Sequence, residues 1–183
     1  MKDTLRQYEK AMGSCRDIFM KKTSDYGTAW RVLRMISILD QLFIKAKRIR
    51  TLQQKGVSMV KEDIRGEFQA TVNYGIIGLI QLDLNTESTE DLPPAEAGAL
   101  YDEKVRMVRE VMEKKNHDYG EAWREMSQEG FTDLILMKLL RIKQILANEG
   151  KTIISEGIDA NLTDIINYAV FALIGIEEGR HRA

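Results

Sequence analysis

The chain has 183 residues, and its 44% hydrophobic and 30% charged content is ordinary for a folded globular protein. Its 27 lysines and arginines balance 28 aspartates and glutamates, so the net charge of −1 does not favour direct binding to nucleic acid or to an anionic membrane. A single cysteine excludes an intramolecular disulfide, and one cysteine with two histidines is too few for a standard Cys/His zinc site. The sequence has neither the apolar core of a signal peptide nor an apolar run of membrane length, which predicts a cytoplasmic protein.

Helical periodicity governs the first half of the chain. Apolar residues at helical spacing predict a helix over residues 4–22, and Gly27 follows it as a helix stop or a tight turn. Two more helices are predicted at residues 38–54 and 60–82, the last of them strongly apolar. Residues 83–96 are polar and acidic and contain both prolines, so they are predicted to form an exposed linker.

The second half repeats the first. KTSDYGTAWR at residues 22–31 matches KNHDYGEAWR at residues 115–124, and the correspondence continues to the last helix with one extra residue in the second half. The same helices are expected at residues 97–116, 131–148 and 158–178, and no alternating pattern predicts a strand. We therefore predict an all-α protein. Two tandem three-helix repeats, residues 1–82 and 97–183, pack about a pseudo-twofold axis into one helical bundle.

The repeated K-x-x-D-Y-G-x-A-W-R motif gathers charged and aromatic residues at a turn between helices. Such a turn can form the edge of a pocket in which lysine meets phosphate, tyrosine or tryptophan stacks on a base, and aspartate holds a metal or a ribose hydroxyl. Alternatively, the tryptophans pack in the core and the aspartate caps the next helix. The candidate residues are Lys22, Asp25, Tyr26, Trp30, Lys115, Asp118, Tyr119 and Trp123.

A second repeated pattern, D-x-x-x-x-K-x-x-R-I, lies on the middle helix of each copy. It contains Lys45 and Arg48 in the first copy and Lys138 and Arg141 in the second. Lysine and arginine three residues apart share one helical face, beside the apolar stripe, and can reach into a pocket for phosphates. The alternative is a solvated face with internal ion pairs, which stabilise a fold little.

The last helix of each copy adds carboxylates and an asparagine. We expect Glu62, Glu67, Glu156 and Asp164 to supply ligands for Mg²⁺, although the residues at a helix start are also favoured there by the helix dipole. Asn73 and Asn167 lie in apolar runs and are expected to join a polar network with the Asp-Tyr-Gly turn. The two halves are not chemically equal, because Ala70 stands where the second copy has Asp164.

These motifs together resemble two tandem copies of the nucleotide-modification-associated domain type 1 family. The resemblance covers nearly all of the chain except the linker, and it implies a nucleotide-related role without defining a reaction. More distantly, N161-x-x-D164-x-x-x-Y168 and E67-x-x-A70-x-x-x-Y74 are similar to the E-x-x-D-x-x-x-Y pattern of all-α NTP pyrophosphohydrolases of MazG type. Each half keeps one of the two acids, which leaves open a composite site of Glu67 and Asp164.

Two functional hypotheses follow. The first is a nucleotide-binding protein of nucleotide or DNA-base modification metabolism, extending to Mg²⁺-dependent nucleotide (pyro)phosphohydrolysis. Its partner is a nucleotide-like small molecule, with self-association as a further interaction and no direct contact with nucleic acid or membrane. The second is a non-catalytic helical interaction or structural module, whose repeated polar residues only fix the packing of the two halves.

Overall fold

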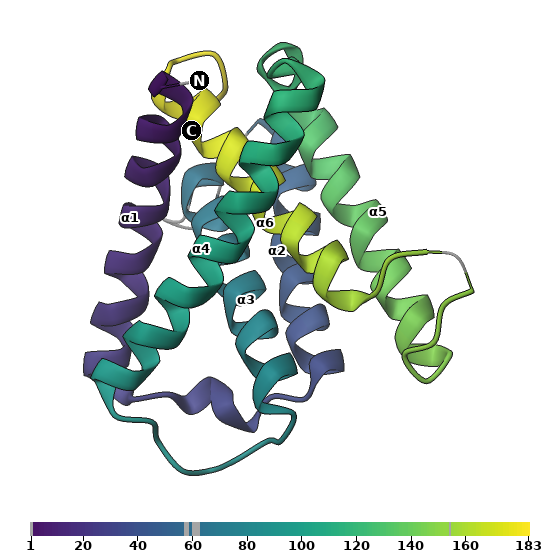
Figure 1. The fold of residues 1–183 in the computed structure, drawn as a ribbon. Helices are drawn as coiled ribbons and strands as arrows, with labels where there is room; N and C mark the ends of the chain where they lie inside the picture. Colours follow the sequence, from purple (N-terminus) through teal and green to yellow (C-terminus); the bar gives the residue numbers. More distant parts are fainter. Residues whose placement is uncertain (1, 57–58, 60–62, 154) are drawn as a thin grey trace.

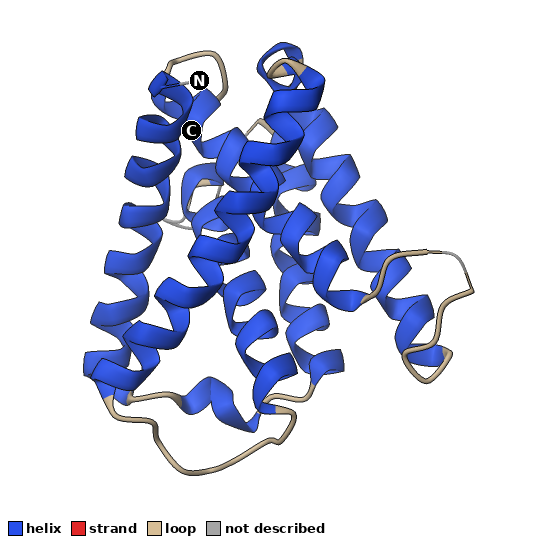
Figure 2. Cartoon of the chain, viewed as in Figure 1, coloured by secondary structure: helices blue, strands red, loops and turns tan. Residues whose placement is uncertain are grey.

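The chain is all-α in the computed structural model, as the sequence predicts (Figures 1 and 2). The structure describes residues 2–56, 59, 63–153 and 155–183, and no strand occurs among them. The helices are α1 (Lys2–Tyr26), η1 (Ala29–Val32), α2 (Met35–Lys55), α3 (Ile64–Leu84), α4 (Pro94–Tyr119), η2 (Ala122–Glu125), α5 (Gln128–Ala147) and α6 (Ile158–Glu177), where η denotes a 3₁₀ helix.

The repeated motif spans a helix end and a tight turn in both copies. Helix α1 runs on to Tyr26 rather than ending at residue 22, and Gly27 then ends it with φ of 69°. The Gly27 N–H donates to the carbonyl of Thr23 at 2.9 Å, which closes the last turn. Gly120 ends α4 in the same left-handed conformation. A short 3₁₀ helix follows each glycine and carries the tryptophan of the motif.

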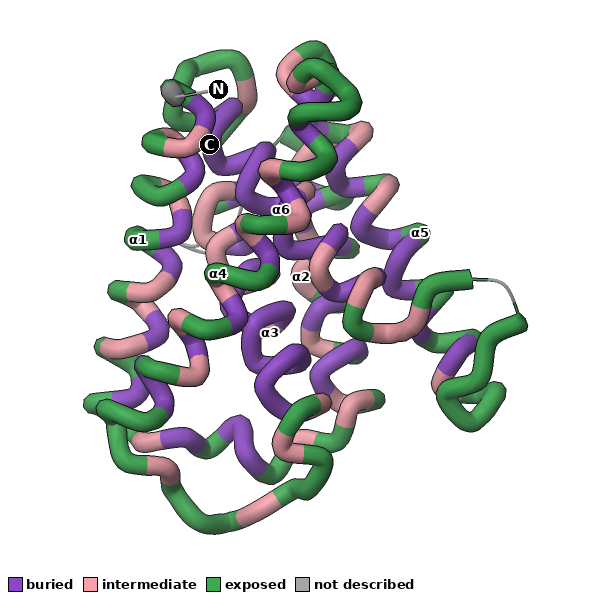
Figure 3. The backbone as a smooth tube through the Cα atoms, in the orientation of Figure 1, coloured by how far each residue is buried: buried purple, intermediate pink, exposed green. Residues whose placement is uncertain are grey.

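Helices α3 and α6 form the centre of the bundle. They pack against each other, α2 and α5 cover one side of the pair, and α1 and α4 cover the other. Figure 3 shows α3 buried along most of its length. Where the two central helices cross, a Cβ atom on Gly75 would lie 2.5 Å from Cγ1 of Ile166, so glycine permits the close approach.

Helix α6 is, among the described helices, the one long and apolar enough by length and composition to cross a membrane. The sequence-based expectation was that no apolar run reaches that length. In the structure, 72% of its most apolar window is buried inside the protein. A central core helix satisfies the same length and composition criteria, and the position of α6 in the bundle is that of such a helix.

A reciprocal pair of hydrogen bonds joins the two copies. The Tyr8 hydroxyl of the first copy donates to Asn167 Oδ1 of the second at 2.7 Å, and Tyr101 of the second donates to Asn73 Oδ1 of the first at 2.7 Å. Each asparagine amide also donates to a backbone carbonyl, of α1 or of α4. Exchange of equivalent contacts is what a pseudo-twofold arrangement requires. The prediction that the asparagines bond to the Asp-Tyr-Gly turn is therefore wrong.

The segment between α3 and α4, residues 85–93, is bound to the first motif. Asp91 accepts a hydrogen bond from the Thr28 N–H at 3.0 Å, and the Leu92 N–H donates to the Thr28 hydroxyl at 2.9 Å. A Cβ atom on Gly27 would lie 2.6 Å from the Asp91 carboxylate. The segment that follows α6 contacts the second motif through other side chains, since Arg180 donates to the carbonyl of Arg124 at 2.8 Å, so the surroundings of the two turns differ.

Candidate functional site

The motif of the first copy lines a cavity of about 370 Å³. The cavity lies between the end of α1, the turn with η1, and helix α3. Four residues that the sequence predicts as nucleotide-binding, Lys22, Tyr26, Trp30 and Asn73, are among its lining residues. The volume falls within the roughly 300–1,000 Å³ of small-molecule sites. This is the place where the sequence analysis expects a pocket.

The wall of this cavity is mostly apolar and aromatic. Phe19 and Trp30 are buried, whereas Tyr26 at the rim is 57% exposed. The buried Nε1 of Trp30 has no hydrogen-bond partner among the described residues, so a donor in the wall remains unsatisfied. Asn73 lines the cavity with its side-chain oxygen and nitrogen already bonded, as described above.

Lys22 is the one charged residue among those described in the cavity wall. It is exposed, and no ion pair or hydrogen bond of its side chain occurs within the part of the chain that the structure describes. An unpaired ammonium beside an aromatic hollow is suited to an anion that carries an aromatic group. The first copy therefore offers one available cation and an apolar wall.

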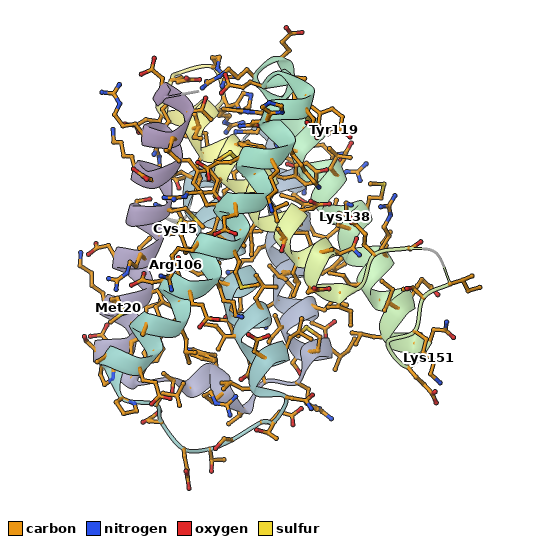
Figure 4. The ribbon with its side chains drawn as sticks, in the orientation of Figure 1. Cys15, Met20, Arg106, Tyr119, Lys138 and Lys151 are labelled. Carbon is orange, nitrogen blue, oxygen red and sulfur yellow. The ribbon has the colours of Figure 1, made fainter. Side chains whose placement is uncertain are left out.

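In the second copy the equivalent lysines contact an acid of their own copy. Asp164 of α6 accepts a hydrogen bond from Lys115 Nζ at 2.7 Å and forms an ion pair with Lys138 Nζ at 2.8 Å. Lys138, labelled in Figure 4, extends from α5 to reach this carboxylate on α6. Burial alone would lower the pKa of Lys115, but the hydrogen bond and charge of Asp164 outweigh it, so the pKa is raised.

An aromatic stack completes the packing of the second copy. Trp123 lies on Phe171 with ring centroids 4.2 Å apart and an angle of 6° between the planes. The first copy has Ile77 in place of Phe171, and Ile77 and Trp30 both line the cavity. The smaller side chain covers less of the tryptophan. The first copy therefore has the smaller residues Ala70 and Ile77 at the cavity, where the second copy has Asp164 and Phe171.

The first copy keeps a buried acid, but one helical turn earlier. Glu67, 2% exposed, accepts a hydrogen bond from Arg48 at Oε1, and its Oε2 lies 3.6 Å from Lys45 Nζ. The second copy has Asn161 at the position of Glu67, and the Asn161 amide donates to the carbonyl of Gly157 at 2.7 Å. Each copy thus neutralises its middle-helix lysine with an acid of its own last helix.

Several predicted residues lie away from the cavity. Asp25 and Glu156 are exposed, Tyr119 is 74% exposed, and Asp118 contacts His117 Nδ1 at 3.1 Å. Arg141 is exposed and contacts a methionine sulfur. Glu62 lies outside the described residues. The predicted binding roles of these residues stay predictions.

The described carboxylates do not gather into a metal site of three protein ligands, and the predicted ligand Glu62 lies outside the described residues. No group of three His, Cys, Asp or Glu side chains lies close enough together in the described part of the chain to hold a metal ion. Glu67 and Asp164 each contact cations of their own copy rather than joining in one site. We therefore derive no chemical step through a metal.

Three features of the candidate site were not predicted from the sequence. Phe19 and Tyr74 line the cavity, but in the sequence they look like ordinary members of an apolar helix. Phe171 fills the space in the second copy, and only its alignment with Ile77 could have signalled that difference. The arginine of the first motif, Arg31, is buried and bonds to Gln81, so it fixes the turn to α3.

The model of one family, nucleotide modification associated domain 1, matches two segments of the chain, residues 22–82 and 115–176. Each match begins at the lysine of the repeated motif and extends into the last helix of its copy, and the two together cover more than half of the chain. No curated protein and no solved structure matches the chain. The distant similarity to MazG-type enzymes stays a prediction.

Proposed function

The chain belongs to the nucleotide modification associated domain 1 family, and from this membership and the geometry of the first copy we propose that it binds a nucleotide in the cavity beside Trp30. The observation that carries the proposal is the contrast between two equivalent lysines. Lys115 is neutralised by Asp164, whereas Lys22 lines a cavity and has no ionic partner among the described residues.

The chemistry of the wall suits the two ends of a nucleotide. Trp30 and the neighbouring aromatic residues offer flat apolar surface, and a base stacks on such surface with a gain of roughly 1–3 kcal/mol per base. Lys22 supplies the charge that a phosphate needs, at the exposed end of the cavity.

Hydrolysis of the nucleotide with Mg²⁺ stays a prediction, because the described carboxylates form no group of three ligands and Glu62 lies outside the described residues. The competing hypothesis of a non-catalytic structural module gains support from the reciprocal Tyr–Asn hydrogen bonds and the internal ion pairs of Lys45 and Arg48. The two hypotheses differ at the cavity, since only the first predicts that a nucleotide binds there in a way that depends on Lys22.

The test is a nucleotide-binding measurement on the full chain by calorimetry and thermal melting, with and without Mg²⁺. Binding should raise the melting temperature, by a stabilisation that grows with the logarithm of ligand concentration over Kd. Lys22→Met should weaken binding roughly ten- to a hundredfold, because a charge-assisted hydrogen bond contributes about 1.5–3 kcal/mol. The matched control is Lys21→Met, because Lys21 pairs with Asp17 on the outer face of α1.

Two results would defeat the proposal. One is that no nucleoside mono-, di- or triphosphate binds the wild-type chain under any of these conditions. The other is that nucleotides bind equally well to the Lys22→Met and wild-type proteins, which would place the ligand elsewhere on the molecule.

A further inference from the structure

The second copy shows what fits between its two lysines. The carboxylate of Asp164 uses one oxygen for Lys115 and the other for Lys138, at 2.7 and 2.8 Å. Asp164 and Lys138 are both buried, so this is a formed anion site and not a loose surface contact. The anion is small, a single carboxylate, and it is supplied by the protein itself.

The first copy has the same two lysines without that anion. Lys22 and Lys45 are the counterparts of Lys115 and Lys138, and Ala70 stands in place of Asp164. Lys22 and Ala70 both line the cavity. The space that a carboxylate at position 70 would take is therefore available to a ligand.

Lys45 is not among the residues that line the cavity, and to reach this space it would leave its ion pair with Glu67. Its Nζ lies 3.6 Å from Glu67 Oε2, beyond hydrogen-bond distance, and that oxygen has no hydrogen-bond partner among the described residues. Lys138 shows that a lysine at this helical position reaches the residue aligned with Ala70. Arg48 bonds to the other oxygen of Glu67, so the glutamate keeps a cation if Lys45 moves.

The aromatic stack provides a second correspondence. Phe171 lies flat on Trp123 and follows Asp164 by two helical turns on the same helix, so the second copy presents an anion and a ring from one face of α6. At the equivalent positions the first copy has Ala70 and Ile77, both in the cavity wall beside Trp30. A ligand with a planar ring and a small anionic group could make the same two contacts in the first copy, a ring on the tryptophan and an anion between the lysines.

We propose that the first copy binds a nucleoside monophosphate, with its phosphate between Lys22 and Lys45 where the second copy has the Asp164 carboxylate, and its base against Trp30 where the second copy has Phe171. This inference rests on the proposed function and narrows it to one class of nucleotide. A monophosphate fits better than a triphosphate, because Lys22 is the one charged side chain among the described lining residues of a cavity of about 370 Å³, and Lys45, from outside that lining, adds one further cation.

The first experiment compares the nucleoside with its mono-, di- and triphosphates by calorimetry on the full chain, one base at a time. The monophosphate should bind at least tenfold more tightly than the nucleoside and no more weakly than the triphosphate. Binding of the triphosphate tenfold more tightly than the monophosphate overturns this inference but leaves nucleotide binding intact. No binding of any nucleotide removes the proposed function as well.

The second experiment exchanges the anion between the copies. Ala70→Asp should lower monophosphate affinity at least tenfold, because the new carboxylate occupies the lysines, whereas the uncharged and similarly sized Ala70→Asn should retain more of the affinity. Equal losses in both variants would indicate steric blocking and contradict the inference. Circular dichroism establishes whether each variant is folded.

A complementary variant decides the matter if Ala70→Asp does not fold. Asp164→Ala leaves Lys115 and Lys138 without their shared carboxylate, so its melting temperature should fall below that of the wild type. Inorganic phosphate should then raise the melting temperature of Asp164→Ala more than sodium chloride does at equal ionic strength. Phosphate should also raise the melting temperature of Asp164→Ala more than that of the double variant Asp164→Ala/Lys115→Met. Equal responses to the two salts would show that the lysine pair does not select a small anion and would overturn the inference.

Discussion

Removing the Tyr8 hydroxyl tests the contact that joins the two copies. In Tyr8→Phe the ring stays buried, but Asn167 Oδ1 loses the donor that lies 2.7 Å away. Both residues are buried, so the acceptor is left unsatisfied away from water. Such a loss costs about 1–3 kcal/mol, more than the net contribution of an ordinary hydrogen bond. We expect the free energy of unfolding to fall by that amount.

Urea denaturation followed by circular dichroism measures this change. With an unchanged m-value, a loss of about 2 kcal/mol lowers the midpoint by roughly 1 M if m is about 2 kcal/mol/M. Tyr101→Phe removes the equivalent bond to Asn73, also 2.7 Å, and should lower stability by a similar amount. Tyr119→Phe is the control, because this tyrosine is exposed and should leave the midpoint unchanged.

The reasoning is refuted if Tyr8→Phe unfolds at the wild-type urea concentration. A large loss for Tyr8→Phe with none for Tyr101→Phe would also contradict it, because the reciprocal geometry gives both hydroxyls the same role. A change in m would show instead that the transition had ceased to be two-state or that the denatured ensemble had changed.

Three further predictions concern pH, thiol reactivity and helix packing. Burial raises the pKa of Tyr8 and Tyr101 above the ordinary value of 10.0, so their stabilising effect is complete below pH 10 and declines at higher pH as the unfolded chain ionises first. Above pH 10, Tyr8→Phe should reduce the fall in unfolding free energy by about 1.4 kcal/mol per pH unit relative to wild type, and an unchanged slope would contradict this. Burial also raises the pKa of the Cys15 thiol to about 12, so a disulfide reagent at pH 8 should modify this thiol slowly in the native protein and rapidly in urea. Rapid labelling of the native protein would contradict this, because it would show that the thiol is accessible. Gly75→Ala should lower the free energy of unfolding by about 1–3 kcal/mol, measured by heat or urea, because the added methyl group overpacks the α3–α6 crossing. Gly13→Ala is the control: nothing lies within 4 Å of its added Cβ, so it should be neutral or stabilising. Equal effects of the two substitutions would contradict the close approach at Gly75.

The all-α fold was predictable because its determinants are local. The helical stripes recur in both halves, and glycine after Asp-Tyr marks the end of α1 and of α4. The repeat also identified which residues correspond, and so indicated the pseudo-twofold relation before any contact was known. The end of α1 was placed four residues early, since Thr23 to Tyr26 form a last turn whose closing hydrogen bond depends on Gly27.

The position of the cavity was predictable, but the partners of the candidate residues were not. The motif marks the turn that lines the cavity, and the alignment of Ala70 with Asp164 marks where the copies differ. Which cation meets which acid depends on distances between helices that no local pattern contains. The predicted network around the asparagines failed for the same reason, because the tyrosines that bind them come from the opposite copy.

The segment from residue 85 to residue 93 joins the two copies in one chain, which allows them to change independently by mutation. In a dimer of identical chains each substitution occurs in both subunits, so one site cannot lose an acid while its mate gains one. Here the connection between α3 and α4 makes the two halves parts of a single gene product. The first half can then carry Glu67 and Ala70 at the positions where the second half carries Asn161 and Asp164. Mutation can alter the polar residues of one copy while the other copy continues to stabilise the shared core.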